Sequence, residues 1–290
     1  IGCRPVGPRR EAVSGARRGG RPSHRAAPGL GESVQELARR ELARRVASIL
    51  GATPVLTTAS DVQELPAIDL LERQYGWALE SRTHLTAVSA AVVNGEHVGV
   101  YQESGSQAWW PASQPAHLRR YPSLKALADA QPRAALIVTH RLLPPAVMAS
   151  LPPTVVYRPR CLAVGIGCNR NTTSQEIAQA IDVTLAESGL AAGSIACIAS
   201  VRDKADEPGL LEACRQRGWQ LCWFDREQIL ALGTPPNPSP WAEQALGVPG
   251  VAEPAAMLAA GSKTLLVPKV RRGNVTVAVA LRSATQGVER

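Results

Sequence analysis

The sequence predicts an α/β protein: a layered α/β/α C-terminal domain with a mixed sheet, a partial N-terminal α/β domain and a small middle α+β region. Three observations predict this fold. From Cys161 onward, short apolar runs alternate with segments that carry helix caps. Within Cys161–Glu176, a strand, a glycine-containing turn and a helix are expected in succession. Near the end, three residues join the runs Leu265–Val270 and Asn274–Leu281, which predicts a hairpin.

The first 32 residues are expected to form a disordered basic leader. Residues 1–30 hold seven arginines and one acid, so +6 of the net charge of +8 lies there. Their composition has no helix or strand period. Basic leaders can bind nucleic acid, but no aromatic residues are interleaved here, so nucleic acid is not expected as a partner. The chain begins with Ile, and one hypothesis is a fragment or a misread frame.

A partial N-terminal domain is predicted over residues 33–76. Apolar residues recur every four positions in Val34–Leu50, which predicts a helix. The run Pro54–Thr58 predicts a short strand, and Ala67–Tyr75 predicts a second helix that begins after a proline. These segments form one β–α step.

Residues 77–150 form the predicted middle region. Its elements are expected in this order: a helix (Thr83–Val93), a strand (His97–Glu103), a loop (Ser104–Tyr121), a short helix (Ser123–Ala130) and a strand (Ala134–Thr139). In the loop, Trp109 and Trp110 either cover a large planar ligand or, more simply, pack the loop onto the core. A linker is predicted after this region from the prolines Pro144, Pro152, Pro153 and Pro159.

Residues 160–285 form the predicted C-terminal domain. After its opening strand and helix, we expect a strand (Ser194–Ser200), a helix (Gly209–Arg217), a strand (Trp219–Phe224), a helix (Arg226–Leu232), two helices that begin at Pro240 and Pro254, and the final hairpin. Strands that alternate with helices are typical of a layered domain.

The turn after the opening strand is suited to negative charge. Gly165 and Gly167 allow a ligand or another backbone to come close. Thr173 and Glu176 have the spacing of a capping box, in which Glu176 reaches back to the cap. The helix N-terminus carries unpaired donors, and Arg170 precedes it. An ordinary strand–turn–helix junction is the alternative, because one glycine-rich turn is weak evidence.

Cysteine and histidine usage predicts no zinc site. The six cysteines form no C-x-x-C pair, and the five histidines are scattered. We expect the cysteines to be small buried hydrophobes in a reducing cytoplasm. No run reaches the roughly 18 apolar residues that span a bilayer, so no membrane association is expected.

Four sequence blocks carry a family resemblance. In chain order they are VGIGCNRNTTSQEI (Val164–Ile177), DKADEPGLLE (Asp203–Glu212), VAEPAAMLAAG (Val251–Gly261) and LLVPKVRRGNVTVAVA (Leu265–Ala280). Together they resemble the CbiG proteins of cobalamin biosynthesis, the cobalt-precorrin 5A hydrolases. The C-terminal half also resembles the stand-alone protein CobE. The glycine-rich S-G-H segment of CbiG is not found. Asn169 and Asn171 stand where that family commonly has a basic residue and a glycine.

The resemblance implies a hydrolase of the anaerobic pathway that acts on a carbon–carbon bond. Water opens the ring-A lactone of cobalt-precorrin 5A, acetaldehyde leaves, and cobalt-precorrin 5B is formed. No cofactor is expected, because the cobalt enters with the corrinoid substrate. Neighbouring cobalamin-pathway methyltransferases and a second copy of the chain are candidate partners.

A substrate rich in carboxylates needs cations and hydrogen-bond donors. The candidate substrate-binding residues are Gly165, Gly167, Arg170, Thr172, Thr173, Lys204 and Lys269. Lactone hydrolysis also needs a base and oxyanion donors, and the candidate catalytic residues are Glu207, Glu253 and Cys168. Activated water is favoured over a Cys168 thiolate, because no histidine lies in the four blocks. The alternative for each charged residue is a solvated surface charge or a partner of a helix dipole.

Two other functions compete with the hydrolase. The chain could be a non-catalytic corrinoid carrier similar to CobE, since the N-terminal blocks of CbiG are missing. A nucleotide-phosphate binder is disfavoured, because the pattern G-x-x-x-x-G-K-[ST] is absent.

Overall fold

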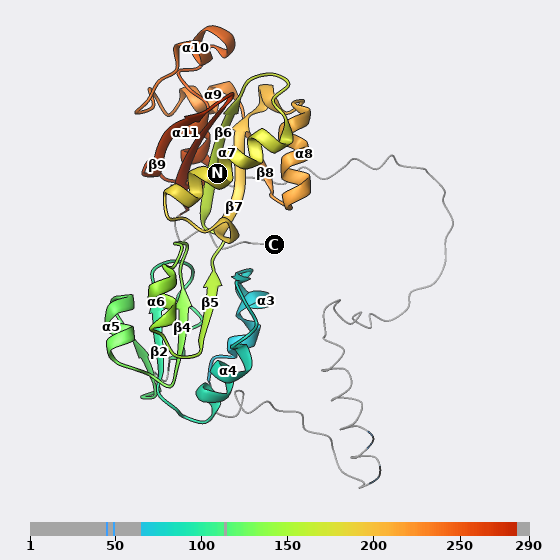
Figure 1. Cartoon of the computed structure of the whole chain (residues 1–290). Helices are drawn as coiled ribbons and strands as arrows, with labels where there is room; N and C mark the ends of the chain where they lie inside the picture. The colour runs from blue at the N-terminus through green and yellow to red at the C-terminus, as the bar shows by residue number, and fades with distance from the viewer. Residues whose placement is uncertain (1–44, 46–48, 50–64, 113–114, 283–290) are drawn as a thin grey trace. The chain divides into compact units, whose positions relative to one another are not determined.

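The computed structural model describes residues 45, 49, 65–112 and 115–282. The predicted leader, the strand over Pro54–Thr58 and nearly all of the helix over Val34–Leu50 lie outside these residues. The described residues form two five-stranded mixed sheets with helices packed on them (Figure 1). The expected α/β class is therefore confirmed.

The first sheet has the strand order β1-β5-β4-β2-β3. Its strands are β1 (Ala78–Leu79), β2 (Val98–Gln102), β3 (Leu118–Arg120), β4 (Ala134–Val138) and β5 (Thr154–Arg158). Strands β2 to β5 run parallel to one another, and β1 is antiparallel to its neighbour β5. One face is covered by the 3-10 turn η1 (Ile68–Leu70), α3 (Leu71–Tyr75) and α4 (Leu85–Val93), and the other by α5 (Leu124–Asp129) and α6 (Pro145–Ala149) (Figure 1).

The predicted linker is wrong, because its prolines flank regular elements. Helix α6 begins at Pro145, where a missing N–H costs nothing. Pro152 and Pro153 precede β5, all of whose residues are buried. The Tyr157 hydroxyl donates to the Ile68 carbonyl at 2.6 Å, which ties this strand to the start of the described chain.

The predicted loop Ser104–Tyr121 contains the short strand β3, and its tryptophans pack onto the sheet. Trp109 is buried, and its indole N–H donates to Gln102 at 2.9 Å. Trp110 meets Trp109 edge-on with ring centroids 5.3 Å apart, and Arg120 stacks over it at 4.2 Å. The structure therefore supports the simpler alternative, in which the two tryptophans pack the loop onto the core.

The second sheet has the order β8-β7-β6-β10-β9. Its strands are β6 (Leu162–Cys168), β7 (Ile195–Val201), β8 (Leu221–Phe224), β9 (Leu265–Arg272) and β10 (Val275–Leu281). Strands β6, β7 and β8 are parallel, whereas β10 is antiparallel to both β6 and β9. The carboxyl ends of β6, β7 and β9 therefore lie at one edge of the sheet, where β10 begins.

Helices α7 (Ser174–Glu187) and α8 (Pro208–Arg217) cover one face of this sheet. On the other face lie α9 (Arg226–Leu230), α10 (Pro240–Leu246) and α11 (Ala252–Ala260). Figure 1 shows α10 at the end of the sheet at which β6 finishes. Helix α11 begins at Ala252, two residues before the predicted start at Pro254.

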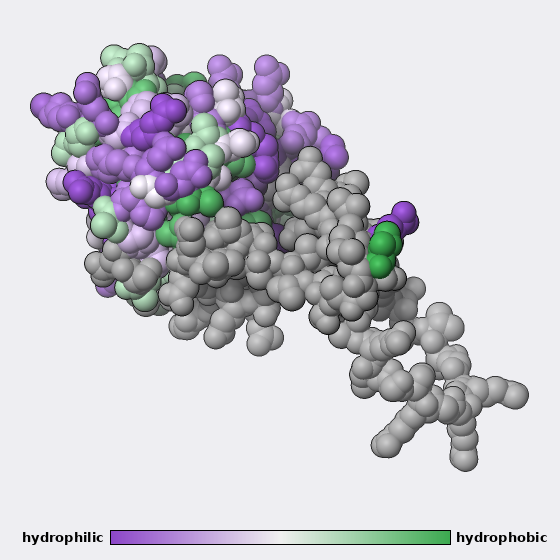
Figure 2. All heavy atoms as spheres, turned by 90° about the horizontal axis from the view of Figure 1, so that it is seen from below, coloured by the Kyte–Doolittle hydropathy of each residue, from purple (hydrophilic) through white to green (hydrophobic). Residues whose placement is uncertain are grey.

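The exterior is mainly polar on the face that Figure 2 displays, where hydrophilic residues surround small apolar patches. Within the described part of the chain, no helix is long and apolar enough to cross a bilayer.

Candidate functional site

A cavity of about 510 Å³ opens at the carboxyl edge of the second sheet. The chain leaves β6 towards β7 on one side, while β10 lies on the other side of β6, so the strand order reverses here. Ligands of open α/β sheets bind at such switch points. The end of β6 contributes Gly167 and Cys168, the β9–β10 hairpin contributes Arg271 and Asn274, and α10 contributes Trp241 and Leu246.

Three cations line this cavity: Lys204, Lys269 and Arg271. Among the described lining residues there is no carboxylate and no histidine. Trp241 and Leu246 of α10 add apolar surface to the same lining. The cavity can therefore hold an anion that also carries apolar surface.

Lys204 is the most deeply placed of the cations, at 4% exposure. It ends the 3-10 turn that follows β7. Its ammonium lies 3.8 Å from Oε2 of Glu207, beyond hydrogen-bond distance. An ammonium has three donors, and this one lines the cavity. It is thus placed to bind an anionic ligand directly.

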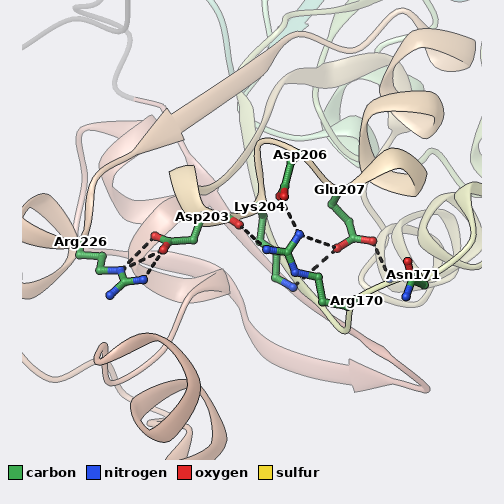
Figure 3. Close-up of polar contacts among 7 residues, drawn as sticks. All are labelled: Arg170, Asn171, Asp203, Lys204, Asp206, Glu207 and Arg226. Carbon is green, nitrogen blue, oxygen red and sulfur yellow. Dashed lines mark hydrogen bonds and ion pairs between the residues drawn. The ribbon is translucent and has the colours of Figure 1, made fainter.

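Glu207 pairs with Lys204 and holds the turn after β6 (Figure 3). It is 1% exposed, and its Oε1 accepts the backbone N–H of Asn171 at 2.6 Å. Asn171 has φ +60°, a conformation that asparagine adopts more readily than most residues. This explains how asparagine replaces the glycine expected there. Oε2 of Glu207 has no hydrogen bond among the described residues, although Arg170 Nη1 lies 3.7 Å away.

Arg170 points to acidic neighbours and is not among the residues that line the cavity (Figure 3). Its guanidinium donates to Asp206 at 2.6 Å and to the Asp203 carbonyl at 3.2 Å. The hydrogen bond from Arg170 lowers the pKa of Asp206, so this carboxylate stays charged. The Asp203 carboxylate pairs with Arg226. The structure therefore does not support Arg170 as a substrate clamp.

Glu253 is buried at 1% exposure and accepts three hydrogen bonds. They come from the backbone N–H of Asn237 (2.9 Å), its side-chain amide (2.7 Å) and the backbone N–H of Lys269 (2.9 Å). The Lys269 ammonium in turn donates to the carbonyls of Asn237 (2.5 Å) and Pro238 (3.0 Å). Glu253 thereby fixes the loop that carries α10 to strand β9.

Several other predicted residues have local partners. Thr172 donates to the Asn169 carbonyl at 2.8 Å, and Thr173 accepts the Glu176 N–H at 3.2 Å as the cap of α7. The Glu176 carboxylate does not reach back, as a capping box requires, but accepts the backbone N–H of Asn274 at 2.9 Å. These contacts join the N-terminus of α7 to the hairpin.

The two glycines have different roles. A Cβ on Gly165 would lie 1.8 Å from the Ala252 carbonyl, so this glycine admits α11 rather than a ligand. The prediction of Gly165 as a binding residue is corrected on this ground. Gly167 lines the cavity, where a Cβ would lie 2.6 Å from the Thr276 hydroxyl.

Cys168 lines the cavity but is 6% exposed. Burial raises the pKa of its thiol to about 11. The thiol is therefore protonated at neutral pH, which favours activated water over attack by Cys168.

Sequence reasoning missed Arg271 and Trp241. Arg271 lies in the fourth sequence block, and the predicted hairpin next to the β6 turn could have pointed to it. Trp241 has no comparable signal, because it lies outside the four sequence blocks and the sequence alone does not show whether a tryptophan is buried or exposed. No three or more His, Cys, Asp and Glu side chains gather to hold a metal ion in the part of the chain that the structure covers.

Known protein families match the segments that form both sheets. Residues 66–159 match the family described as Cobalamin biosynthesis central region, and residues 162–280 match Cobalamin synthesis G C-terminus. The chain is 43% identical over 243 residues to "Cobalt-precorrin-5A hydrolase" of Priestia megaterium, covering 83% of this chain and 65% of that protein. It is 29% identical over 255 residues to the protein of the same name from Salmonella typhimurium (81% and 66%).

A shorter relative matches less than half of the chain. "Protein CobE" of Sinorhizobium sp is 32% identical over 121 residues, covering 41% of this chain and 79% of CobE. The chain thus spans about two thirds of the length of the two hydrolases it matches.

Proposed function

The chain belongs to the CbiG family of cobalamin biosynthesis proteins, and we propose that it is a cobalt-precorrin-5A hydrolase. In this reaction water adds to the ring-A lactone carbonyl and opens the lactone to a carboxylate. The carbon–carbon bond to the two-carbon unit then breaks, acetaldehyde leaves, and cobalt-precorrin 5B remains. The names of the relatives from Priestia megaterium and Salmonella typhimurium support this proposal.

The observation that carries the proposal is the charge of the cavity. Lys204, Lys269 and Arg271 line a space of about 510 Å³ without a carboxylate among its described lining residues. Cobalt-precorrin 5A carries several carboxylates around a macrocycle. A hydrogen bond between charged groups contributes about 1.5–3 kcal/mol, so three such cations discriminate strongly in favour of an acidic ligand.

The positions of the charged residues suggest distinct roles. Lys204 is deep, and among the described residues its ammonium has only the 3.8 Å ion pair with Glu207 and no hydrogen bond, so we assign it to the substrate and to the oxyanion that forms when water adds to the lactone. Lys269 and Arg271 lie at the strand edge and bind peripheral carboxylates. Glu207 and Glu253 act as positioning residues, because one holds the Asn171 turn and the other holds the α10 loop.

The remaining features of the proposal come from the family. The cobalt arrives as part of the substrate and no resident cofactor is required. The candidate partners are neighbouring methyltransferases of the pathway and a second copy of the chain. We place the reaction in the cytoplasm, where buried thiols such as Cys168 and Cys214 remain reduced.

The test is to incubate the whole chain with cobalt-precorrin 5A and to measure acetaldehyde. We expect stoichiometric release by the unaltered chain and by Arg170→Ala, and a loss of at least about 100-fold in rate for Lys204→Met. Tight corrinoid binding without acetaldehyde would instead support a carrier similar to CobE, which the 32% identity to CobE over 121 residues favours. If the chain neither binds the corrinoid nor releases acetaldehyde, both the hydrolase and the carrier are rejected.

A further inference from the structure

Trp241 is a large apolar side chain left exposed at the mouth of the cavity. It is 56% exposed and lines the cavity as the second residue of α10. Its indole makes no aromatic contact and no hydrogen bond with any described residue, in contrast to that of Trp109, which donates to Gln102. Tryptophan is enriched at interfaces, where its apolar ring meets a partner while its N–H stays near water.

The backbone that carries Trp241 is firmly held. The Ser239 N–H donates to the Pro249 carbonyl at 2.7 Å, and the Ser239 hydroxyl caps α10. Upstream, Asn237 is bound by the Glu253 carboxylate and by the Lys269 ammonium. The indole therefore projects from a wall whose position is set by α11 and β9.

The charged residues that line the cavity differ from Trp241 in chemistry and come from other elements. The turn after β7 supplies Lys204, and β9 supplies Lys269 and Arg271. We call these three residues the cationic wall, whereas α10 supplies the apolar Trp241 and Leu246. A small inorganic anion would use only the cationic wall. A flat conjugated ring with acidic substituents uses both, because its substituents reach the cations while its face covers the indole.

We propose that Trp241 is a specificity-determining residue whose indole stacks on the face of a carboxylate-bearing tetrapyrrole held by the cationic wall. This inference rests on the proposed function, since it takes the same cavity and the same class of ligand. It adds that recognition of the ring plane comes from α10 and not from the strands. It further states that loss of the indole weakens binding without removing any charge.

The test measures binding of cobyrinic acid, a stable cobalt corrinoid with free carboxylates, to the whole chain by equilibrium dialysis. We expect Trp241→Ala to raise Kd about tenfold, or ~1.4 kcal/mol, and Trp241→Phe to raise it less than threefold. The matched control is Leu230→Ala on α9, which removes an apolar side chain that is 50% exposed and outside the cavity, and its Kd should be unchanged.

A second measurement separates stacking from a change in folding. Corrinoid binding should quench tryptophan fluorescence, and this quenching should fall in Trp241→Phe but persist in Trp219→Phe. If Trp241→Ala binds within twofold of the unaltered chain, while the latter releases acetaldehyde from cobalt-precorrin 5A, the stacking inference is wrong and the proposed function stands. If the unaltered chain neither binds the probe nor releases acetaldehyde, both are wrong.

Discussion

Replacing Glu253 by glutamine tests whether this carboxylate holds the cavity wall or acts as a base. In the structure it is 1% exposed and accepts three N–H groups, two from Asn237 and one from Lys269. Glutamine keeps one acceptor oxygen and turns an NH₂ group towards one of these donors. One buried donor then loses its partner, which costs about 1–3 kcal/mol of stability. The remaining two hydrogen bonds become weaker, because their acceptor no longer carries a charge.

The expected sum is a loss of about 3 kcal/mol in the free energy of unfolding. For a folded body of this size, 1 kcal/mol lowers Tm by about 2–4 °C, so Tm should fall by about 6–12 °C. Thermal unfolding of the whole chain, followed by circular dichroism, measures this. Glu227→Gln on the exposed side of α9 is the matched control and should change Tm by less than about 3 °C. A Glu253→Gln chain with unchanged Tm and no acetaldehyde release would contradict the positioning role and indicate a base.

Three further predictions follow from the packing and charges of the second sheet. Gly165→Ala should lower the free energy of unfolding in urea by at least about 3 kcal/mol, because the new Cβ meets the backbone of α11. The control Gly193→Ala should be nearly neutral, because its Cβ would lie 3.5 Å from the nearest side-chain atom. Equal stabilities of the two variants would refute the close approach. Arg170→Ala should leave corrinoid affinity within threefold, as measured by dialysis, because its guanidinium binds Asp206 outside the cavity; a tenfold loss would return it to the site. Burial raises the pKa of Cys168 from 9.0 to about 11, so its contribution to stability is complete below pH 9 and is lost as pH rises towards 11. The urea midpoint should therefore fall more between pH 8 and 10.5 in the unaltered chain than in Cys168→Ala. If the midpoints of the two chains fall equally with pH, the raised pKa of Cys168 is contradicted.

Local sequence signals predicted the elements of the second sheet well. Thr173 caps α7, Pro208 opens α8, and Gly218 ends it with φ +65°, as expected. The apolar residues Ile177 and Ile181 are fully buried against the sheet. Such features depend on neighbours within one or two helical turns, so a single sequence contains the information.

Partners distant in sequence were not predictable in the same way. Glu176 was expected to close a local capping box, yet it binds Asn274, 98 residues away. Glu253 was expected to face substrate, yet it is saturated by Asn237 and Lys269. In both cases a local motif competes with a tertiary contact, and the pattern of residue types is the same for either outcome.

Proline and tryptophan signals gave mixed results for a physical reason. The proline-rich stretch 144–159 predicted a linker, but a proline is also compatible with the first position of a helix or the residue before a strand, and β5 lies there. The Trp109–Trp110 pair was conspicuous and proved structural, whereas the single Trp241 was not singled out and lies at the cavity.

The most direct test of the cationic cavity compares two ligands that share one macrocycle. The affinity of the whole chain for cobyrinic acid is measured beside that for its fully amidated analogue, at constant ionic strength. With Lys204, Lys269 and Arg271 facing the ligand, the account predicts at least about 100-fold tighter binding of the acid, a gap that narrows in high salt. Equal affinities, or a preference for the amide, would contradict it.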